Sequence, residues 1–462
     1  MTAVDPESAV EPAVRSSGDA GAGTGADAAA DPAVGTGAGT GADPAVGRRW
    51  IPGLLRDTAF RRYWTGQSIS MLGDQVSALA IPLIAVVTLH ADATRMGFLT
   101  AAIWLPNLLF ALHAGAWADR RGRRRRTMIA ADLGRAALVA TLPIGYALHA
   151  LTLAQLYVVA FATGTLSVLF DVSKAPLFQS LVPAGRYVEG SSLVSGSSAM
   201  AQVLGPSLGG LLVQLLSAPL ALLADALSFV ASALCLSRIS PAEPPPAPSG
   251  RSGLAAGRRF IAGSPVMRAA LAATATVNFF TYMVAALFVL YAIGTLHLSA
   301  GLLGAVLGAG AVGGVVGAVS AGAVARRVGV GRMFLVGMIA FPAPMLLIPA
   351  AHGPAPTVLA LLFAAEFGSG IGVMWLDIAA GSIFATVIPS GLLSRVTGAY
   401  RTVNFGVRPL GSLAGGLLAG AIGLRPTLWL AVAGAIASFL WLLPSPLPRL
   451  RELPQPEGQP PG

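Results

Sequence analysis

Charged residues are scarce in this 462-residue sequence. Only 11% of the residues are Asp, Glu, Lys or Arg, whereas 55% are apolar, and the mean hydropathy is +0.72. A soluble domain carries charge on roughly a quarter of its residues. The chain lacks the charge that would cover an ordinary water-facing surface, which excludes a typical soluble protein.

Lysine and cysteine are scarcer still. Lys174 is the single lysine and Cys235 the single cysteine, so no disulfide can form within the chain. The net charge of +10 therefore comes from arginines, most of which lie in short breaks between apolar runs. This placement is typical of membrane-topology signals and not of a phosphate-binding face, so we expect no nucleic-acid partner.

Catalytic and nucleotide-binding signatures are also missing. The sequence has no Gly-x-x-x-x-Gly-Lys-Ser/Thr loop, and ATP-driven transport by this chain is therefore not expected. No His-Glu-x-x-His or serine-nucleophile pattern stands out, so an intramembrane enzyme is the weaker interpretation. We expect no catalytic residues, no metal site and no cofactor. No cleavable signal peptide is expected either, because the first apolar run begins near residue 60 and is too long for one.

Long apolar runs are what the sequence has in abundance. A membrane-spanning helix needs about 20 predominantly apolar residues, and twelve such runs recur along the chain. The first six are 60–89, 96–118, 128–148, 152–181, 191–216 and 218–237, and the second six are 269–294, 299–325, 333–351, 356–388, 397–423 and 425–443. The sequence thus predicts an all-α membrane protein of twelve transmembrane helices in two six-helix bundles.

The segments outside these runs have a different composition. Residues 1–55 are rich in Ala, Gly and Pro and predict a disordered tail, residues 238–266 predict a linker between bundles 56–237 and 267–443, and residues 444–462 form a second Pro-rich tail. If the first tail lies inside, arginines gather on the inner side, and only Arg95 and Arg425 fall outside. We therefore expect both termini to be cytoplasmic in a multi-pass protein of the cell membrane, surrounded by the lipid bilayer. We also expect the protein to be a monomer.

The two halves of the sequence repeat one another. The segment 115–122 (GAWADRRG) precedes 322–329 (GAVARRVG) by 207 residues, and Asp171, Pro183 and Gly205 precede Asp377, Pro389 and Gly411 by 206. Matching at nearly one offset over a hundred residues implies two units of the same topology. In such proteins the substrate binds between the units.

The first copy of this repeat resembles the loop signature between helices 2 and 3 of the major facilitator superfamily. Glycine allows a close helix approach and a tight turn, and the aspartate suits the N-terminus of a neighbouring helix. In that family the contact latches the inner ends of the two halves together. The resemblance, which covers residues 56–443, implies an inner-gate latch made of Gly115, Asp119, Arg120, Gly122, Arg123 and Asp171.

A second motif resembles the antiporter motif of drug and metabolite exporters. The helix predicted over 191–216 contains Gly205, Pro206, Gly209 and Gly210, and such a helix can bend and pack tightly against a partner. An ordinary glycine-rich packing helix is the alternative. The glycines of 299–325 make that helix the expected partner. Features of 387–411 resemble the macrolide-efflux and enterobactin-exporter branch, which implies export driven by proton entry.

Acidic residues inside the predicted spans are the candidates for proton coupling, because ionisable groups are costly there. Glu366 has no basic residue within a helical turn and is the first candidate, while Asp74 is either a proton carrier or a structural acid. Asp171 either pairs with Lys174 on its own helix or with Arg123 of the loop. Asp132 and Arg135 form a similar local pair, and by family topology Asp225 is expected off the cavity.

Polar and aromatic residues in the spans are candidates for substrate contact, with packing between helices as the equal alternative. Their character suits an amphipathic organic molecule such as a drug, an antibiotic or a siderophore-like metabolite. An importer of a small metabolite, or a non-transporting receptor on the same scaffold, remains an alternative to a proton-coupled exporter. The candidates are Gln67, Asn278, Tyr282, Trp375 and Asn404.

The latch hypothesis makes a direct prediction. Replacing Asp119 with Asn removes the charge that would sit against a helix N-terminus, so transport should be crippled while membrane insertion is unchanged. Transport assays and membrane-fraction immunoblots of the variant measure the two effects. Normal transport by Asp119→Asn would refute the latch at this position.

Overall fold

The structure is a computed structural model, and it describes residues 53–241 and 253–449. Throughout these ranges the regular secondary structure is helical. The predicted N-terminal tail, apart from its last three residues, the middle of the predicted linker and most of the C-terminal tail lie outside the described residues.

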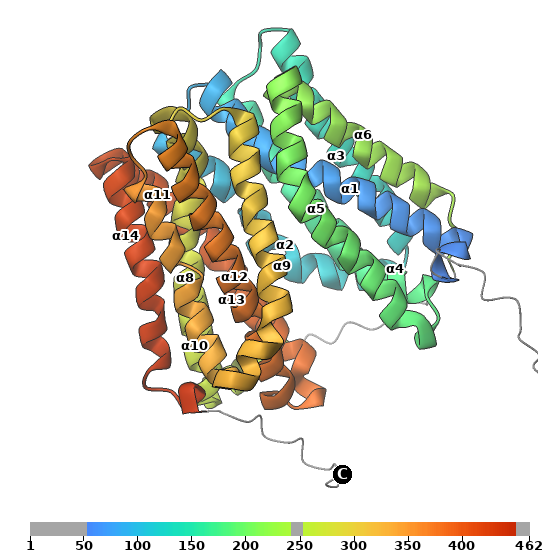
Figure 1. Cartoon of the computed structure of the whole chain (residues 1–462). Helices are drawn as coiled ribbons and strands as arrows, with labels where there is room; N and C mark the ends of the chain where they lie inside the picture. The colour runs from blue at the N-terminus through green and yellow to red at the C-terminus, as the bar shows by residue number, and fades with distance from the viewer. Residues whose placement is uncertain (1–52, 242–252, 450–462) are drawn as a thin grey trace, which may run out of the picture. The chain divides into compact units, whose positions relative to one another are not determined.

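The first half contains six long helices and the second half contains the corresponding set (Figure 1). In the first half these are α1 (Thr58–Leu83), α2 (Ala93–Arg121), α3 (Arg124–Ala147), α4 (Leu153–Leu181), α5 (Tyr187–Leu216) and α6 (Ala218–Ser237). In the second half they are α8 (Pro265–Leu290), α9 (Ala300–Val328), α10 (Val330–Ala340) with the short α11 (Leu347–Ala350), α12 (Ala355–Val387), α13 (Leu393–Ile422) and α14 (Leu424–Ala437).

Membrane-spanning length is met throughout this set. Eleven of the described helical segments are long and apolar enough to cross a membrane. The remaining long helix, α2, has 29 residues, which also exceeds the about 20 residues that a span requires. The twelfth predicted span falls on α2, and its crossing of the membrane stays a prediction.

Two details differ from the predicted helices. The predicted span 333–351 is interrupted after Ala340, where Pro342 lies in a turn before the 3-10 segment Ala343–Leu346. Proline lacks the N–H that would continue an α-helix, which accounts for the break. The predicted linker also contains a helix, α7 (Gly253–Gly263), which packs on the start of α13.

The internal repeat is visible in the backbone. Both α1 and α8 end in one π-helical turn, Ile84–Thr88 and Tyr291–Thr295, at the 207-residue offset found in the sequence. Gly122 and Gly329, at the same offset, have φ angles of 62° and 85°. Only glycine adopts this region readily, so the predicted tight turn at Gly122 is confirmed.

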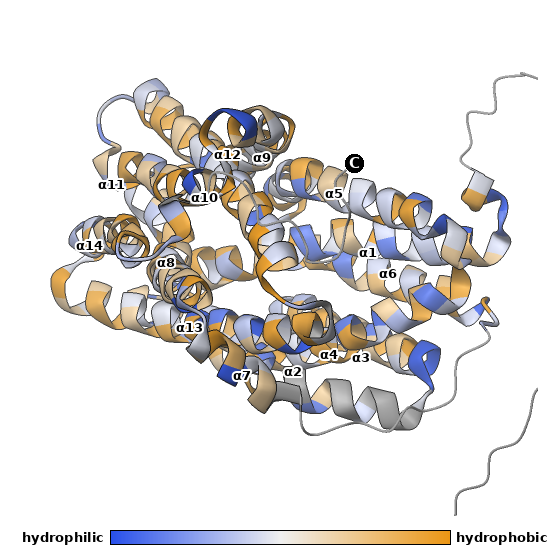
Figure 2. Cartoon of the chain, turned by 90° about the horizontal axis from the view of Figure 1, so that it is seen from below, coloured by the Kyte–Doolittle hydropathy of each residue, from blue (hydrophilic) through white to orange (hydrophobic). Residues whose placement is uncertain are grey.

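Apolar side chains also cover the outside of the bundle. Figure 2 shows hydrophobic residues spread over the helices instead of gathered on their inner faces alone. Large exposed apolar residues recur on α5, α6, α9, α12 and α13. In water such surface would drive aggregation, whereas in a bilayer it faces lipid.

The two halves touch mainly through two helix pairs, α2 with α13 and α5 with α9. A Cβ added to Gly210 would lie 2.6 Å from the carbonyl oxygen of Ala300 and 3.0 Å from Cα of Gly304. A Cβ on Gly97 would lie 2.8 Å from Cα of Gly416. Only glycine permits so close an approach of backbones.

These glycine contacts all lie at one end of the molecule. They involve the starts of α2 and α9 and the ends of α5 and α13. We call this end of the molecule the closed end. Toward the opposite end, the open end, α5 and α9 diverge (Figure 1).

The predicted pairing of the Gly-Pro helix with 299–325 is confirmed for part of each helix. Gly304 and Gly308 of α9 face α5, where Gly308 approaches Ser207. Gly313 and Gly317 instead face α12. The glycines of α9 therefore lie at two helix contacts, one with α5 of the first half and one with α12 of the second half.

The close backbone contact at Gly210 predicts that adding one methyl group there separates the helices. Gly210→Ala should force α5 and α9 apart, because the added carbon would clash with the backbone of α9 and overpacking costs about 1–3 kcal/mol. Spin labels on Leu216 and Leu302, in a Cys235→Ser background, should report a population with a longer distance. Gly196→Ala on the same helix is the control, since no atom lies within 4 Å of its added Cβ. Identical distance distributions for the two variants would contradict the tight contact.

Candidate functional site

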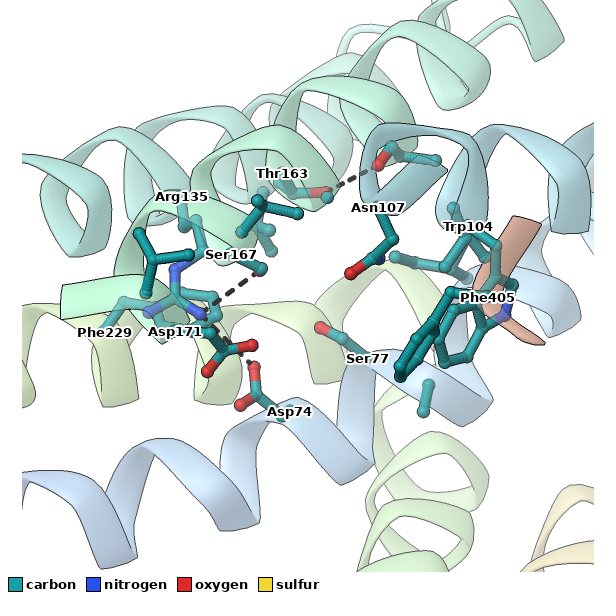
Figure 3. Close-up of a pocket in the computed structure, with 18 of the residues that line it drawn as sticks. Asp74, Ser77, Trp104, Asn107, Arg135, Thr163, Ser167, Asp171, Phe229 and Phe405 are labelled. Atoms are coloured by element: carbon teal, nitrogen blue, oxygen red, sulfur yellow. Dashed lines mark hydrogen bonds and ion pairs between the residues drawn. The ribbon is translucent and has the colours of Figure 1, made fainter. Parts of the chain in front are cut away.

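A cavity of about 720 Å³ lies between the helices. Its walls come from α1, α2, α3, α4 and α6 of the first half and from α13 of the second. It reaches toward the open end, since Asp171 and Gly398 line it in the open-end halves of α4 and α13. Figure 3 shows Arg135, Asp171 and Asp74 on one side of this cavity, and Trp104 and Phe405 on the other.

The charged side is organised around Arg135 of α3. Its guanidinium forms an ion pair and a hydrogen bond with Asp132, one helical turn earlier, and the two residues are 3% and 0% exposed. Its Nη1 lies 3.9 Å from Oδ1 of Asp74 on α1. The rings of Phe170 and Phe229 stack on the guanidinium, 4.5 Å and 4.2 Å from Cζ. The predicted Asp132–Arg135 pair is thus present, and it extends to Asp74.

Asp74 itself faces the cavity, and its side chain is 51% exposed there. A carboxylate with this access can exchange protons with water or contact a ligand. Because Arg135 also forms an ion pair with Asp132, its positive charge balances the negative charge of Asp74 only in part.

Asp225 of α6 contradicts the expectation that it lies off the cavity. It lines the cavity, accepts a hydrogen bond from the Ser77 hydroxyl of α1, and accepts a second from Ser228 at 3.1 Å. The reason is the close approach of α1 and α6 at Gly73. A Cβ there would lie 2.7 Å from Cβ of Ser228 and 2.5 Å from Oδ1 of Asp225.

Asp171 of α4 pairs with Lys174 in the same helix. The two atoms Nζ and Oδ1 are 3.1 Å apart, as the three-residue spacing predicts. The side chains of Gly115, Asp119 and Arg120 lie outside the described residues, so their part in the latch stays a prediction.

The aromatic side of the cavity joins the two halves. Trp104 of α2 lies 5.2 Å from Tyr282 of α8 and 6.0 Å from Phe405 of α13, measured between ring centroids. The guanidinium of Arg408 lies over all three rings, at 4.6 Å, 4.8 Å and 4.2 Å respectively. Arg401 lies 5.7 Å from the ring of Phe405 and lines the cavity. This cluster is the contact between α2, α8 and α13 next to the cavity.

Most of the predicted substrate contacts are interhelical contacts in this conformation. Asn278 donates to Asn404 at 3.1 Å between α8 and α13, and Trp375 donates to Ser320 at 3.0 Å between α12 and α9. Gln67 is 2% exposed and does not line the cavity. Tyr282 alone belongs to the aromatic group beside the cavity.

Glu366 also lies apart from the cavity lining. It faces α9, where a Cβ on Gly310 would be 3.1 Å from its Oε2. Among the described residues it has no ion-pair partner, as the sequence predicts. Its role in proton coupling stays a prediction.

The sequence interpretation named Arg135 only as the partner of Asp132 and gave no role in the site to Arg401 or Arg408. Arg135, Arg401 and Arg408 all lie inside apolar runs, and the cost of burying a guanidinium marks such residues in the same way as acids. Ranking the arginines inside the predicted spans beside the acids would have found Arg401 as well. The position of Asp225 at the cavity depends on how α1 and α6 pack against one another, and a local sequence pattern does not show this packing.

The fold and the cavity define a multi-helix membrane transporter. The model of the Major Facilitator Superfamily matches residues 63–407 and 271–461, and the chain belongs to this family. It is 28% identical over 411 residues to the multidrug efflux pump Tap of Mycolicibacterium fortuitum, covering 82% of this chain and 93% of that protein. It is also 30% identical to the uncharacterized MFS-type transporter YfiS of Bacillus subtilis, over 39% of that protein.

Solved structures support the same fold. A bacterial homologue of the iron transporter ferroportin in an inward-facing state matches with a TM-score of 0.68 at 17% identity, covering 85% of this chain and 99% of that chain. The same kind of homologue in an outward-facing state scores 0.56. The nucleoside transporter NupG, as its D323A mutant, scores 0.67 at 10% identity, over 83% of this chain and 99% of that chain.

The buried ion pair predicts a stability effect. Asp132→Asn leaves the buried guanidinium of Arg135 without its main partner, and breaking such a pair costs about 3–5 kcal/mol. The melting temperature in detergent, followed by tryptophan fluorescence, should fall by several degrees. Asp92→Asn is the control, because that carboxylate is 62% exposed in its pair with Arg95. Equal melting of the two variants would contradict the structural role of Asp132.

Proposed function

We propose that this transporter is a proton-coupled exporter of an amphipathic organic molecule in the cell membrane. The observation that carries the proposal is the cavity carboxylate of Asp74, which is exposed to the cavity and only partly balanced by Arg135. The similarity to a protein named a multidrug efflux pump supports export.

The orientation follows from the arginines. The open end carries Arg61, Arg62, Arg126 and Arg186, whereas the described closed end carries Arg95 and Arg425. Arg425 is held by two hydrogen bonds, because it donates to the Tyr291 hydroxyl at 3.1 Å and to the Ala351 carbonyl at 2.9 Å. By the positive-inside rule, this distribution supports a cytoplasmic open end. In this orientation the cavity takes its substrate from the cytoplasm.

The lining suits an amphipathic molecule. Ile81, Ile103, Val139 and the ring of Trp104 offer apolar contact, and a few polar groups among them fix orientation. Ser77, Asn107, Thr163 and Ser167 provide those polar groups. Such a pocket recognises shape and a small number of charges.

Competition at Asp74 would couple the two fluxes. A substrate that enters from the cytoplasm displaces the proton from the protonated carboxyl group, which releases that proton to the cytoplasm. A proton from outside then displaces the substrate after the halves rearrange. Each ligand shifts the balance between conformations only by its difference in affinity for them. Separation of the glycine contacts at the closed end would be the rearrangement that opens the cavity outward.

Everted membrane vesicles test this proposal. With an acidic interior, vesicles that contain the chain should accumulate rhodamine B, and a protonophore should abolish the accumulation. Asp74→Asn should reduce uptake to the level of vesicles without the chain, because amide cannot exchange a proton, while Asp92→Asn should transport normally.

Two outcomes would contradict the proposal. Gradient-driven uptake by Asp74→Asn would refute the coupling role of Asp74, and uptake only with an alkaline interior would indicate import. Glu366→Gln in the same assay tests the other candidate: loss of uptake supports a coupling role at the α9–α12 contact, and normal uptake excludes it.

A further inference from the structure

The cavity has two poles of opposite charge, and they belong to different halves of the protein. The acidic pole is formed by α1, α3, α4 and α6, and the basic pole by α13. In Figure 3 Asp74 and Asp171 lie on one side, and Trp104 and Phe405 lie on the other, with Ser77 between them.

The acidic pole has more carboxylates than cations. Among the residues that the structure describes, Asp74, Asp132, Asp171 and Asp225 have two cations beside them, Arg135 and Lys174. Asp132 takes the direct pair with Arg135, and the side chains of Asp74 and Asp171 are 51% and 66% exposed. This pole can therefore accept a cationic group from a ligand, or protons in its place.

The basic pole has the opposite imbalance. Arg401 and Arg408 lie 5.7 Å and 4.2 Å from the ring of Phe405. Within the described part of the chain, neither guanidinium has a carboxylate within ion-pair distance. Stacking on aromatic rings leaves the N–H edge of Arg401 available at the cavity wall, and a guanidinium edge matches a carboxylate.

We propose that the transported molecules are aromatic zwitterions, with a cationic group bound at Asp74, a carboxylate bound at Arg401, and the ring system against Trp104 and Phe405. This inference rests on the proposed function and names its substrate class. A lipophilic cation that has no carboxylate leaves Arg401 without a partner. An anion that has no cationic group is repelled by the carboxylates of the acidic pole. Discrimination therefore comes from both walls.

A zwitterion of this kind also connects the halves. Asp74 lies on α1 and Arg401 lies on α13, and both line the cavity. A ligand that pairs with both side chains therefore links the first half to the second. This link draws the α13 side of the open end toward the first half. Substrate binding then favours closure of the open end, which transport requires next.

A matched pair of dyes tests the inference. Rhodamine B carries a cationic xanthene and a free carboxylate, and its ethyl ester keeps the cation without the carboxylate. Fluorescence polarisation with the purified full chain in detergent should give at least about tenfold tighter binding of rhodamine B, which is the scale of one charge-assisted contact.

Single-residue variants test whether the preference for rhodamine B over its ester depends on Arg401 of the basic pole. Arg401→Gln should remove the preference by weakening rhodamine B about tenfold while leaving the ester unchanged. Arg395→Gln, two turns earlier on α13 and outside the cavity lining, should bind both dyes as the unaltered chain does. Asp74→Asn should weaken both dyes alike.

The outcomes separate this inference from the proposed function. Equal binding of the two dyes, tighter binding of the ester, no binding of either, or a preference that survives Arg401→Gln would overturn the inference. A preference lost in Arg401→Gln, together with no gradient-driven flux in vesicles, would support the zwitterion site and refute the exporter.

Discussion

A guanidinium held among apolar helices must have its charge balanced by the protein itself, and Arg135 is where this constraint acts. Its pair with Asp132 lies within α3, its contact with Asp74 joins α3 to α1, and its stacking on Phe170 and Phe229 joins α3 to α4 and α6. Four helices of the first half therefore meet on one cation. Asp74 is the member of this group that is both charged and widely exposed, because it faces the cavity.

The contact between the halves obeys a different constraint. Between lipid-covered helices the hydrophobic effect contributes little, and close packing of small residues holds them together. Gly210 on Gly304 and Gly97 on Gly416 bring the backbones together at the closed end without side chains that would interlock. Such a contact can be released and formed again at small cost, which suits a transporter whose two ends alternate.

Much of the fold could be predicted from the sequence, because apolar length, arginine placement and the 206–207 offset are local or repeated properties. The pair Asp132–Arg135 followed from spacing, and the turn at Gly122 followed from the loop signature. The site was harder to predict. Asn278 and Asn404 contact one another across α8 and α13, Glu366 faces α9, and Asp225 reaches the cavity where Gly73 admits α6. Which face of a span points to the cavity depends on the packing of all its neighbours, and a hydropathy pattern without a polar side does not define that face.

The central claim is that one cavity carboxylate holds either a proton or the substrate. Proton release on binding measures this most directly, with the purified chain in weakly buffered detergent solution and a pH-indicator dye. Addition of rhodamine B should release protons in proportion to the dye bound, and Asp74→Asn should bind residual dye without release. Binding that releases no protons, or release that persists in Asp74→Asn, would contradict the account.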